Sequence, residues 1–206
     1  RDNQLTHLFV NMVSGEIEDR SLQYGNNTDS GTNGAGKINI DYGNFTDNRD
    51  GKTYKTVRIG NQVWMAENLA YKPSSGNYWA YDNNTSNVAV YGYLYDWETA
   101  KNVCPAGWHL PTDAEWTTLI DYLGGEDVAG GKLKESGTSH WSSPNTGATN
   151  ETGFTALPGG YRSYFGDFSH IGYYGEWWSA TVAYADYAWY RRMDYIYGGV
   201  SRISSD

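Results

Sequence analysis

Tyrosine, serine, glycine and aspartate dominate the last quarter of the chain, residues 161–206. Nine of the 19 tyrosines lie in this segment, which contains no lysine or glutamine and a single glutamate, Glu176. A tyrosine side chain offers a large amphipathic contact area with only two torsions to immobilise, and serine and glycine adapt around it. This composition is typical of a recognition surface, so the chemistry that the segment predicts is noncovalent ligand binding.

Motifs for catalysis are missing from the sequence. It contains no nucleophile elbow, zinc-protease helix, phosphate loop or dinucleotide-binding fingerprint. The one cysteine, Cys104, excludes an internal disulfide and a cysteine-based zinc site. Carboxylates are scattered along the chain and form no motif, so nothing favours a glycosidase. We therefore expect a protein that is not an enzyme and has no cofactor.

Histidines and oxygen-rich runs are the candidates for metal binding. His109 has no second ligand at metal-binding spacing, so we interpret it as a hydrogen-bonded structural histidine. His140 and His170 are single histidines in predicted loops, and we interpret them as solvated or in contact with a ligand. Three runs could bind calcium through their oxygen atoms, although such runs are more often turns: DNRDG (47–51), DNN (82–84) and GGED (124–127). A structural calcium ion is the minor alternative to no cofactor.

Charge and composition limit the partners. The formal net charge is −9 and the isoelectric point is near 4.8, so the surface should repel nucleic acids and anionic membranes. No run of about 18 apolar residues occurs, so we expect no membrane insertion. Hydrophobic residues make up only 39% of the chain, which includes nine tryptophans, so the core must depend on a few large aromatic side chains.

Residues 1–44 differ from the rest and predict an N-terminal appendage or a linker to an anchoring domain. The apolar residues between Asp2 and Val13 fit either one short helix or one strand. The polar run 24–36 predicts a loop, and the alternation at Ile38 and Ile40 predicts a strand that leads into the main body.

Residues 45–206 predict an α+β domain. Two short strands flank the turn at Gly60-Asn61, and residues 94–103 suit a short helix. A second helix should follow the capping-box pair Thr112 and Glu115, with apolar residues at helical spacing up to residue 123. Beyond residue 124 the pattern predicts only short strands: Phe154–Leu157, Glu176–Thr181, Ala188–Met193 and Gly198–Ile203. We expect two short helices, a twisted antiparallel sheet and long irregular loops.

Six strings of the sequence follow one another in a recognisable order: TVRIGNQVWMAENLAY (56–71), YGYLYDW (91–97), CPAGWHLPTDAEW (104–116), GFTALPGGYR (153–162), GEWWSAT (175–181) and AWYRRM (188–193). Together they resemble the Fibrobacter succinogenes major paralogous domain, which occurs in secreted and surface proteins of Bacteroidetes-like bacteria. The resemblance implies a C-type lectin-like fold for residues 45–206. Family members usually end in a strand whose cysteine would pair with Cys104, and this sequence lacks that strand, so we do not transfer the disulfide.

Several members of this family resemble the variable proteins of diversity-generating retroelements, in which a reverse transcriptase rewrites adenine positions of a C-terminal cassette. Such rewriting of asparagine codons cannot produce Lys, Gln, Glu, Met or Trp, and the Glu, Met and Trp of residues 161–206 lie inside the strings above. The positions between the strings are the predicted variable, ligand-binding surface: Ser163, Tyr164, Gly166, Asp167, Ser169, His170, Tyr173, Tyr174, Tyr184, Asp186, Tyr187, Asp194, Ile196, Tyr197, Gly199, Ser201 and Ile203. We expect them to form one contiguous exposed face.

Trp177, Trp178 and Trp189 lie inside the strings. Aromatic faces can stack on sugar rings, but a chain with few aliphatic residues needs its tryptophans in the core, and we expect all three to be buried.

Together, these features predict a receptor or adhesin domain that displays a diversified surface to a protein or glycan ligand on another cell or a host. The resemblance implies an extracellular location at a bacterial cell surface, such as a pilus tip, or alternatively on a phage tail fibre. Two other functions stay open: a structural surface protein whose tyrosine-rich segment packs against a neighbouring domain, and a carbohydrate-active enzyme.

Overall fold

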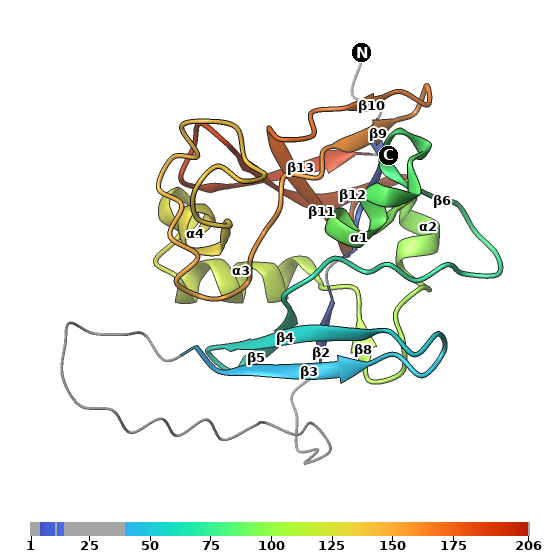
Figure 1. Cartoon of the computed structure of the whole chain (residues 1–206), viewed down its shortest axis with the longest axis horizontal. Coiled ribbons are helices and arrows are strands. Elements are labelled where there is room, and N and C mark those ends of the chain that lie inside the picture. The colour runs from blue at the N-terminus through green and yellow to red at the C-terminus, as the bar shows by residue number, and fades with distance from the viewer. Residues whose placement is uncertain (1–4, 11, 15–39, 206) are drawn as a thin grey trace.

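The computed structural model describes residues 5–10, 12–14 and 40–205, and within them the strands form two sheets (Figure 1). The eight strands of the larger sheet are β1 (Leu5–Phe9), β6 (Tyr78–Trp79), β7 (Leu94–Tyr95), β9 (Tyr161–Ser163), β10 (Phe168–Ser169), β11 (Tyr174–Tyr184), β12 (Tyr187–Asp194) and β13 (Val200–Ser205). Its main path runs β10-β9-β1-β11-β12-β13, and β7 and β6 extend it from β1.

The five strands of the smaller sheet are β2 (Val13–Ser14), β3 (Tyr42–Thr46), β4 (Thr53–Ile59), β5 (Gln62–Met65) and β8 (Trp108–His109). They follow the order β3-β4-β5-β2-β8, and all their pairings are antiparallel. The hairpin of β4 and β5 confirms the two strands predicted around Gly60-Asn61, and Gly60 has a φ of 61° that suits the tight turn.

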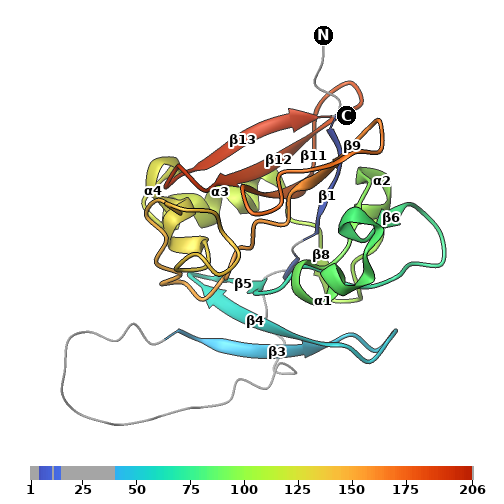
Figure 2. The same ribbon diagram turned by 45° about the horizontal axis from the view of Figure 1, so that its top comes forward.

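The described helices are short: η1 (Tyr81–Asn83), η2 (Thr85–Asn87), α1 (Val88–Tyr91), α2 (Trp97–Ala100), α3 (Asp113–Tyr122) and α4 (Glu126–Leu133). Figure 2 shows α3 and α4 between strands β11–β13 on one side and the smaller sheet on the other. Each helix buries one face, which in α3 carries Trp116, Leu119 and Ile120, and leaves its other residues largely exposed.

The sequence pattern correctly predicted α3. Thr112 accepts a hydrogen bond from the backbone N–H of Glu115 at 3.2 Å, and Glu115 accepts one from the N–H of Thr112 at 2.8 Å, which completes the capping box. Trp116, Leu119 and Ile120 are buried, as their spacing predicted. Local signals determine this helix.

Aromatic rings form the centre of the core, as the composition required. The ring centroids of Trp64 and Trp116 lie 4.8 Å apart, and Phe154 lies 5.9 Å from Trp64 and 6.4 Å from Trp177. All four side chains are almost fully buried. Each such pair stabilises a fold by about 0.5–1.5 kcal/mol beyond the burial of its area, so this cluster joins the smaller sheet, α3 and β11.

The expectation of two helices was wrong. The predicted helix 94–103 is helical only at α2, and α4 was missed because Gly130 and Gly131 are poor helix formers. Packing explains these glycines. A Cβ atom on Gly130 would lie 2.0 Å from the backbone oxygen of Gly199, so the helix needs glycine for this close approach. The predicted strand Phe154–Leu157 contributes only an isolated bridge between Lys134 and Ala156.

The first strands belong to the main body and not to an appendage. β1 pairs with β9, β7 and β11, and β2 lies between β5 and β8 in the smaller sheet. Val10, Met12 and Val13 are completely buried. The predicted boundary at residue 44 also falls within β3, so this division of the chain was wrong for the residues described. The predicted loop 24–36 and Ile38 lie outside them.

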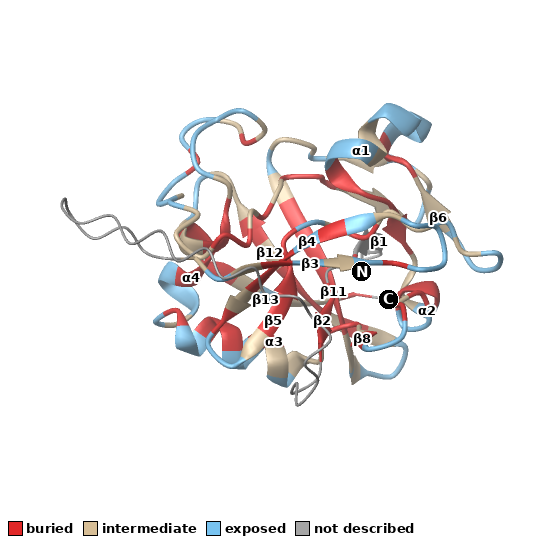
Figure 3. Cartoon of the chain, turned by 60° about the horizontal axis from the view of Figure 1, so that its bottom comes forward, coloured by how far each residue is buried: buried red, intermediate tan, exposed pale blue. Residues whose placement is uncertain are grey.

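The architecture is α+β, with few short helices and mostly antiparallel strands, as predicted. Buried residues gather where α3 meets the central strands, and exposed residues lie on the outer loops (Figure 3). Over the described residues, no helix is both long and apolar enough to cross a membrane.

Candidate ligand-binding surface

The predicted site residue His170 lies between two tyrosine rings. Its ring is nearly parallel to that of Tyr174, with centroids 4.6 Å apart, and to that of Tyr161, with centroids 5.3 Å apart. The guanidinium of Arg192 lies 4.6 Å from the ring centroid of Tyr174. We call Tyr161, His170, Tyr174 and Arg192 the stacked cluster. Burial, aided by the nearby Arg192 charge, lowers the pKa of His170, so this stack favours the neutral imidazole.

A buried carboxylate lies beneath the stacked cluster. Glu176 is fully buried, accepts a hydrogen bond from Arg192 through Oε1, and has no partner for Oε2 among the described residues. Burial raises the pKa of Glu176 to about 7, although Arg192 opposes this shift. Glu176 therefore orients Arg192 from below and does not contact solvent. Sequence reasoning missed Glu176 as a site residue, and its position as the only glutamate of the segment was the available signal.

Further predicted residues lie beside the stacked cluster, most of them in the loop after β12. Tyr173, which precedes β11, is exposed, and its ring meets that of Tyr195 in this loop edge-on at 5.0 Å. The Asp194 carboxylate accepts a hydrogen bond from the N–H of Ile196 at 2.9 Å. Ile196 and Tyr197 are exposed at the tip of this loop. The loop therefore presents apolar and aromatic side chains next to the stack.

A buried lysine fixes this loop from inside. Nζ of Lys134 donates hydrogen bonds to the backbone oxygens of Asp194 and Tyr197, both at 2.8 Å, and of Thr146 at 3.0 Å. Burial lowers the pKa of Lys134 to about 8. The three carbonyl oxygens provide the dipoles that a buried ammonium requires. No sequence pattern indicated this role, because the three acceptors are backbone atoms far apart along the chain.

The tip of the β11–β12 hairpin forms a second group. The rings of Tyr184 and Tyr187 stack with centroids 4.6 Å apart, and Asp186 is exposed between them in the turn. Val182, which was not predicted, is 50% exposed on the same strand. We call Val182, Tyr184, Asp186 and Tyr187 the hairpin group.

The stacked cluster and the hairpin group do not form one contiguous face. Tyr174 and Tyr184 are the first and last residues of β11, which places them about 30 Å apart at 3.3 Å per residue. Trp178 and Tyr190 pair across the strands between them, and both are fully buried. The prediction of a single exposed surface was therefore wrong, because core contacts cover the middle of this sheet face.

The turn between β9 and β10 carries a third group. The N–H of Ser163 donates to the backbone oxygen of Asp167 at 2.8 Å, which closes the turn, and Gly166 adopts a φ of 94°. Tyr164 is 59% exposed and Phe165 is 79% exposed. Phe165 was not in the predicted set, although it has the highest exposure among the large apolar residues described. We call residues 163–167 the turn group.

The remaining predicted positions differ in how far they are buried. Ser201 pairs with Arg192 and Ile203 with Tyr190, and both side chains are half-buried, as is Ser169 in β10. Gly199 is buried, and a Cβ atom there would lie 2.5 Å from the backbone oxygen of Glu126. The prediction of Gly199 as a variable surface position was wrong, because no larger residue fits there without a shift of α4.

The tryptophan prediction holds for two residues of three. Trp177 and Trp178 are fully buried, whereas Trp189 is only half-buried. The guanidinium of Arg202 covers the Trp189 ring at 3.4 Å from its centroid. This contact stabilises a surface-facing tryptophan by a cation–π interaction.

Histidines outside the segment have carboxylate partners. His109 Nε2 lies 2.7 Å from Glu115, which confirms a hydrogen-bonded structural role. His140 Nδ1 lies 2.9 Å from Glu135, and the His140 side chain is partly exposed, so its contact with a ligand stays a prediction. Asp47 of the DNRDG run is fully buried and bound to Arg49. That carboxylate is therefore engaged in an ion pair.

Comparison with known proteins adds one finding. A family model described as the Fibrobacter succinogenes major domain matches residues 57–202, from the middle of β4 into β13. No curated protein and no solved structure matches the chain. The matched region contains the stacked cluster, the turn group and the hairpin group.

Proposed function

Because the chain belongs to the Fibrobacter succinogenes major domain family, we propose that it is a non-catalytic ligand-binding module with a C-type lectin-like fold. Its binding residues are the exposed aromatic and small polar side chains of residues 161–205. One observation carries the proposal. Of the ten large hydrophobic side chains exposed among the described residues, seven lie in this segment: Tyr164, Phe165, Tyr173, Val182, Tyr184, Ile196 and Tyr197.

The backbone that carries the exposed side chains is held rigidly, which favours binding without rearrangement. Tyr174 and Tyr184 are the two ends of one long strand, and Lys134 ties the loop between β12 and β13. An aromatic side chain that is held in place before binding loses little conformational entropy when a ligand covers it. Exposed apolar side chains concentrated in one segment are also a feature of interaction sites.

The separation of the groups favours a protein as the ligand. A typical protein interface covers about 800 Å² on each partner, which is enough to contact two of the three groups. A single sugar unit would contact only one group. A glycan is the second ligand class that this surface suits, through the flat rings at the hairpin tip.

The pattern of exposure supports diversification of the segment. Tyr164, Asp167, Tyr173, Tyr184 and Asp186 are exposed, so changes there alter the surface without altering the core. A near-copy of the coding segment beside a reverse-transcriptase gene, with asparagine codons at these positions, is the expected genomic observation. Absence of such a copy would remove the retroelement part of the proposal and leave the binding part. We place the module at a bacterial cell surface, with a phage tail fibre as the alternative.

Alanine substitution tests the binding surface. Purified wild-type protein and the variants Tyr173→Ala and Tyr184→Ala are applied to a printed glycan array and to an array of purified bacterial surface proteins. We expect at least one wild-type signal that either variant weakens, with a melting temperature close to that of the wild type. Tyr122→Ala is the matched control, because Tyr122 is 66% exposed and lies in α3. Equal losses in the control, or unfolding of both test variants, would contradict the proposal.

A further inference from the structure

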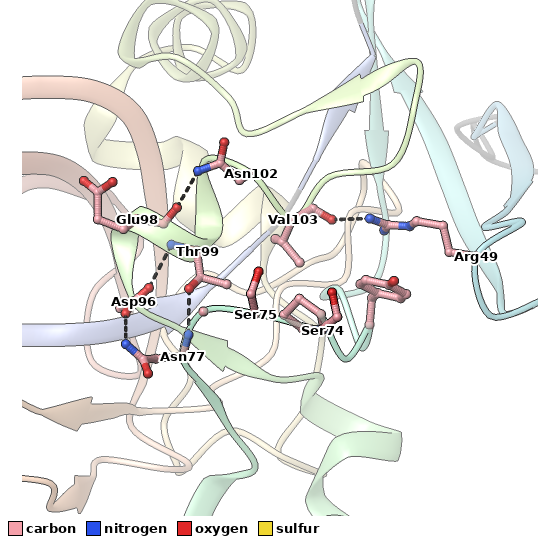
Figure 4. A pocket seen from close by; sticks show the side chains of 12 residues that line it. Arg49, Ser74, Ser75, Asn77, Asp96, Glu98, Thr99, Asn102 and Val103 are labelled. Carbon is pink, nitrogen blue, oxygen red and sulfur yellow. Dashed lines mark hydrogen bonds between the residues drawn. The ribbon is translucent and has the colours of Figure 1, made fainter.

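A polar pocket lies away from the tyrosine-rich segment. It has a volume of about 430 Å³ and is lined only by residues between Arg49 and Val103 (Figure 4). The loop 71–77, the start of α2 and the residues after α2 form its walls. Ligand pockets in proteins have volumes of about 300–1,000 Å³, so this one is large enough for a small molecule or one unit of a polymer.

The walls of the pocket are fixed by internal hydrogen bonds. Asp96 caps α2 by accepting from the N–H of Thr99 at 2.8 Å, and its other oxygen accepts from the side chain of Asn77 at 2.6 Å. The N–H of Asn77 donates to the Thr99 hydroxyl at 2.8 Å. Gly76 lets the loop approach this closely, since a Cβ atom there would lie 2.3 Å from the Thr99 hydroxyl oxygen.

Arg49 is also held in place. It donates to the fully buried carboxylate of Asp47 and, at 2.8 Å, to the backbone oxygen of Val103. Its guanidinium lies 3.7 Å from the ring centroid of Tyr71. The positive charge of Arg49 is thus balanced by Asp47 and does not attract an anion into the pocket.

Several polar atoms of the pocket are left for a ligand. Within the part of the chain that the structure describes, the hydroxyls of Ser74 and Ser75 and the side-chain oxygens of Asn77 and Asn102 have no hydrogen-bond partner. Glu98 pairs with Lys101 at 2.8 Å. The remaining formal charge of the lining is that of Asp96. The pocket therefore offers neutral donors and acceptors, together with a weakly negative field.

We propose that this pocket binds a neutral, polyhydroxylated ligand, namely one sugar unit of a glycan. Adjacent hydroxyls of a sugar can donate to amide oxygens and accept from serine hydroxyls, which are the groups that the pocket presents. The negative charge of Asp96 disfavours an acidic sugar. This site is independent of the tyrosine-rich surface because it shares no residue with it. With so few contacts, a free monosaccharide binds weakly, in the millimolar range.

Nuclear magnetic resonance tests the site. The labelled protein is titrated separately with glucose, galactose, mannose and N-acetylglucosamine, and with N-acetylneuraminic acid as the acidic comparator. At least one neutral sugar should shift the amide signals of residues 74–77 and 96–103 more than the acidic sugar does. If no neutral sugar shifts these signals, or the acidic sugar binds equally well, the proposal is overturned.

A pair of matched variants ties the signal to the pocket. Ser75→Trp places a large side chain at the rim and should weaken the sugar affinity by roughly tenfold or more, because it fills the space that the sugar needs. Ser86→Trp makes the same change at an exposed position in η2, outside the pocket lining, and should leave the affinity unchanged. Equal affinities of the two variants would show that the sugar binds elsewhere. Neither Tyr173 nor Tyr184 lines the pocket, so this test can fail without the failure of the tyrosine surface.

Discussion

The carboxylate of Asp113 at the start of α3 accepts a hydrogen bond from the fully buried Arg191 of β12 at 2.8 Å. It also accepts three hydrogen bonds from Arg202 of β13, two from Nε at 2.9 and 3.1 Å and one from Nη2 at 2.9 Å. Asp113 therefore joins α3 to the last two strands. Asp113→Asn should destabilise the fold by about 3 kcal/mol, because removal of one partner leaves a buried charge unpaired. Urea unfolding at neutral pH measures this, and Asp186→Asn in the exposed hairpin turn should change little.

The same carboxylate predicts the response to acid. Burial alone would raise the pKa of Asp113, but the hydrogen bonds from Arg202 and Arg191 outweigh burial and hold the pKa below its usual value. The folded state thus binds this proton less tightly than the unfolded state. The stabilisation is complete above the usual pKa near 4 and is lost as the pH falls through the lowered value. The stability difference between wild type and Asp113→Asn should therefore narrow below about pH 4. A constant difference across this range would contradict the assignment.

Glu176 predicts the opposite trend at higher pH. Because burial raises its pKa to about 7, the folded state binds this proton more tightly than the unfolded state. Stability should fall as the pH rises from the usual glutamate value, near 4.3, through 7. Glu176→Gln should remove this slope, and thermal melts of both proteins between these values measure it. Glu98→Gln, at an exposed position, should keep the wild-type slope.

Lys134→Met should destabilise the protein by about 2–4 kcal/mol, because three backbone oxygens lose their donor. The largest chemical-shift changes should appear at residues 194–197 and near Thr146. Lys132→Met is the matched control, since Lys132 is partly exposed and forms only a 3.4 Å ion pair with Glu151. An equal loss in both variants would assign the effect to general charge removal.

Gly199→Ala should destabilise by about 1–3 kcal/mol, because its Cβ atom would collide with the Glu126 backbone oxygen. Ser201→Ala, two residues later in a half-buried position, should stay within about 0.5 kcal/mol of the wild type. If both variants are equally stable, Gly199 tolerates a side chain and fits the predicted variable surface after all. Differential scanning calorimetry distinguishes these outcomes.

The sequence predicted the elements that depend on neighbouring residues. The capping box of Thr112 and Glu115 and the turn at Gly60-Asn61 are local signals, and both were correct. α4 could not be predicted, because its two central glycines are favoured only by contact with distant loops. β1 and β2 were ambiguous for a similar reason, since their partners lie far along the chain.

The candidate surface was predicted in its composition but not in its shape. Exposure of Tyr164, Tyr173 and Tyr184 was expected, and the structure confirms it. The separation of these residues into groups follows from the burial of Trp178 and Tyr190 between the ends of β11. Burial of this kind depends on which side of the sheet meets the core, and that is a property of the assembled fold.

The three hydrogen bonds of Lys134 determine in which solutions the loop after β12 keeps its conformation. A loop tied by a bound ion opens when that ion becomes scarce, whereas an ammonium group attached to the backbone cannot diffuse away. This anchor is supplied with every newly made copy of the chain. Because Lys134 is buried, salt screens these hydrogen bonds only weakly, and a chelator removes nothing from them.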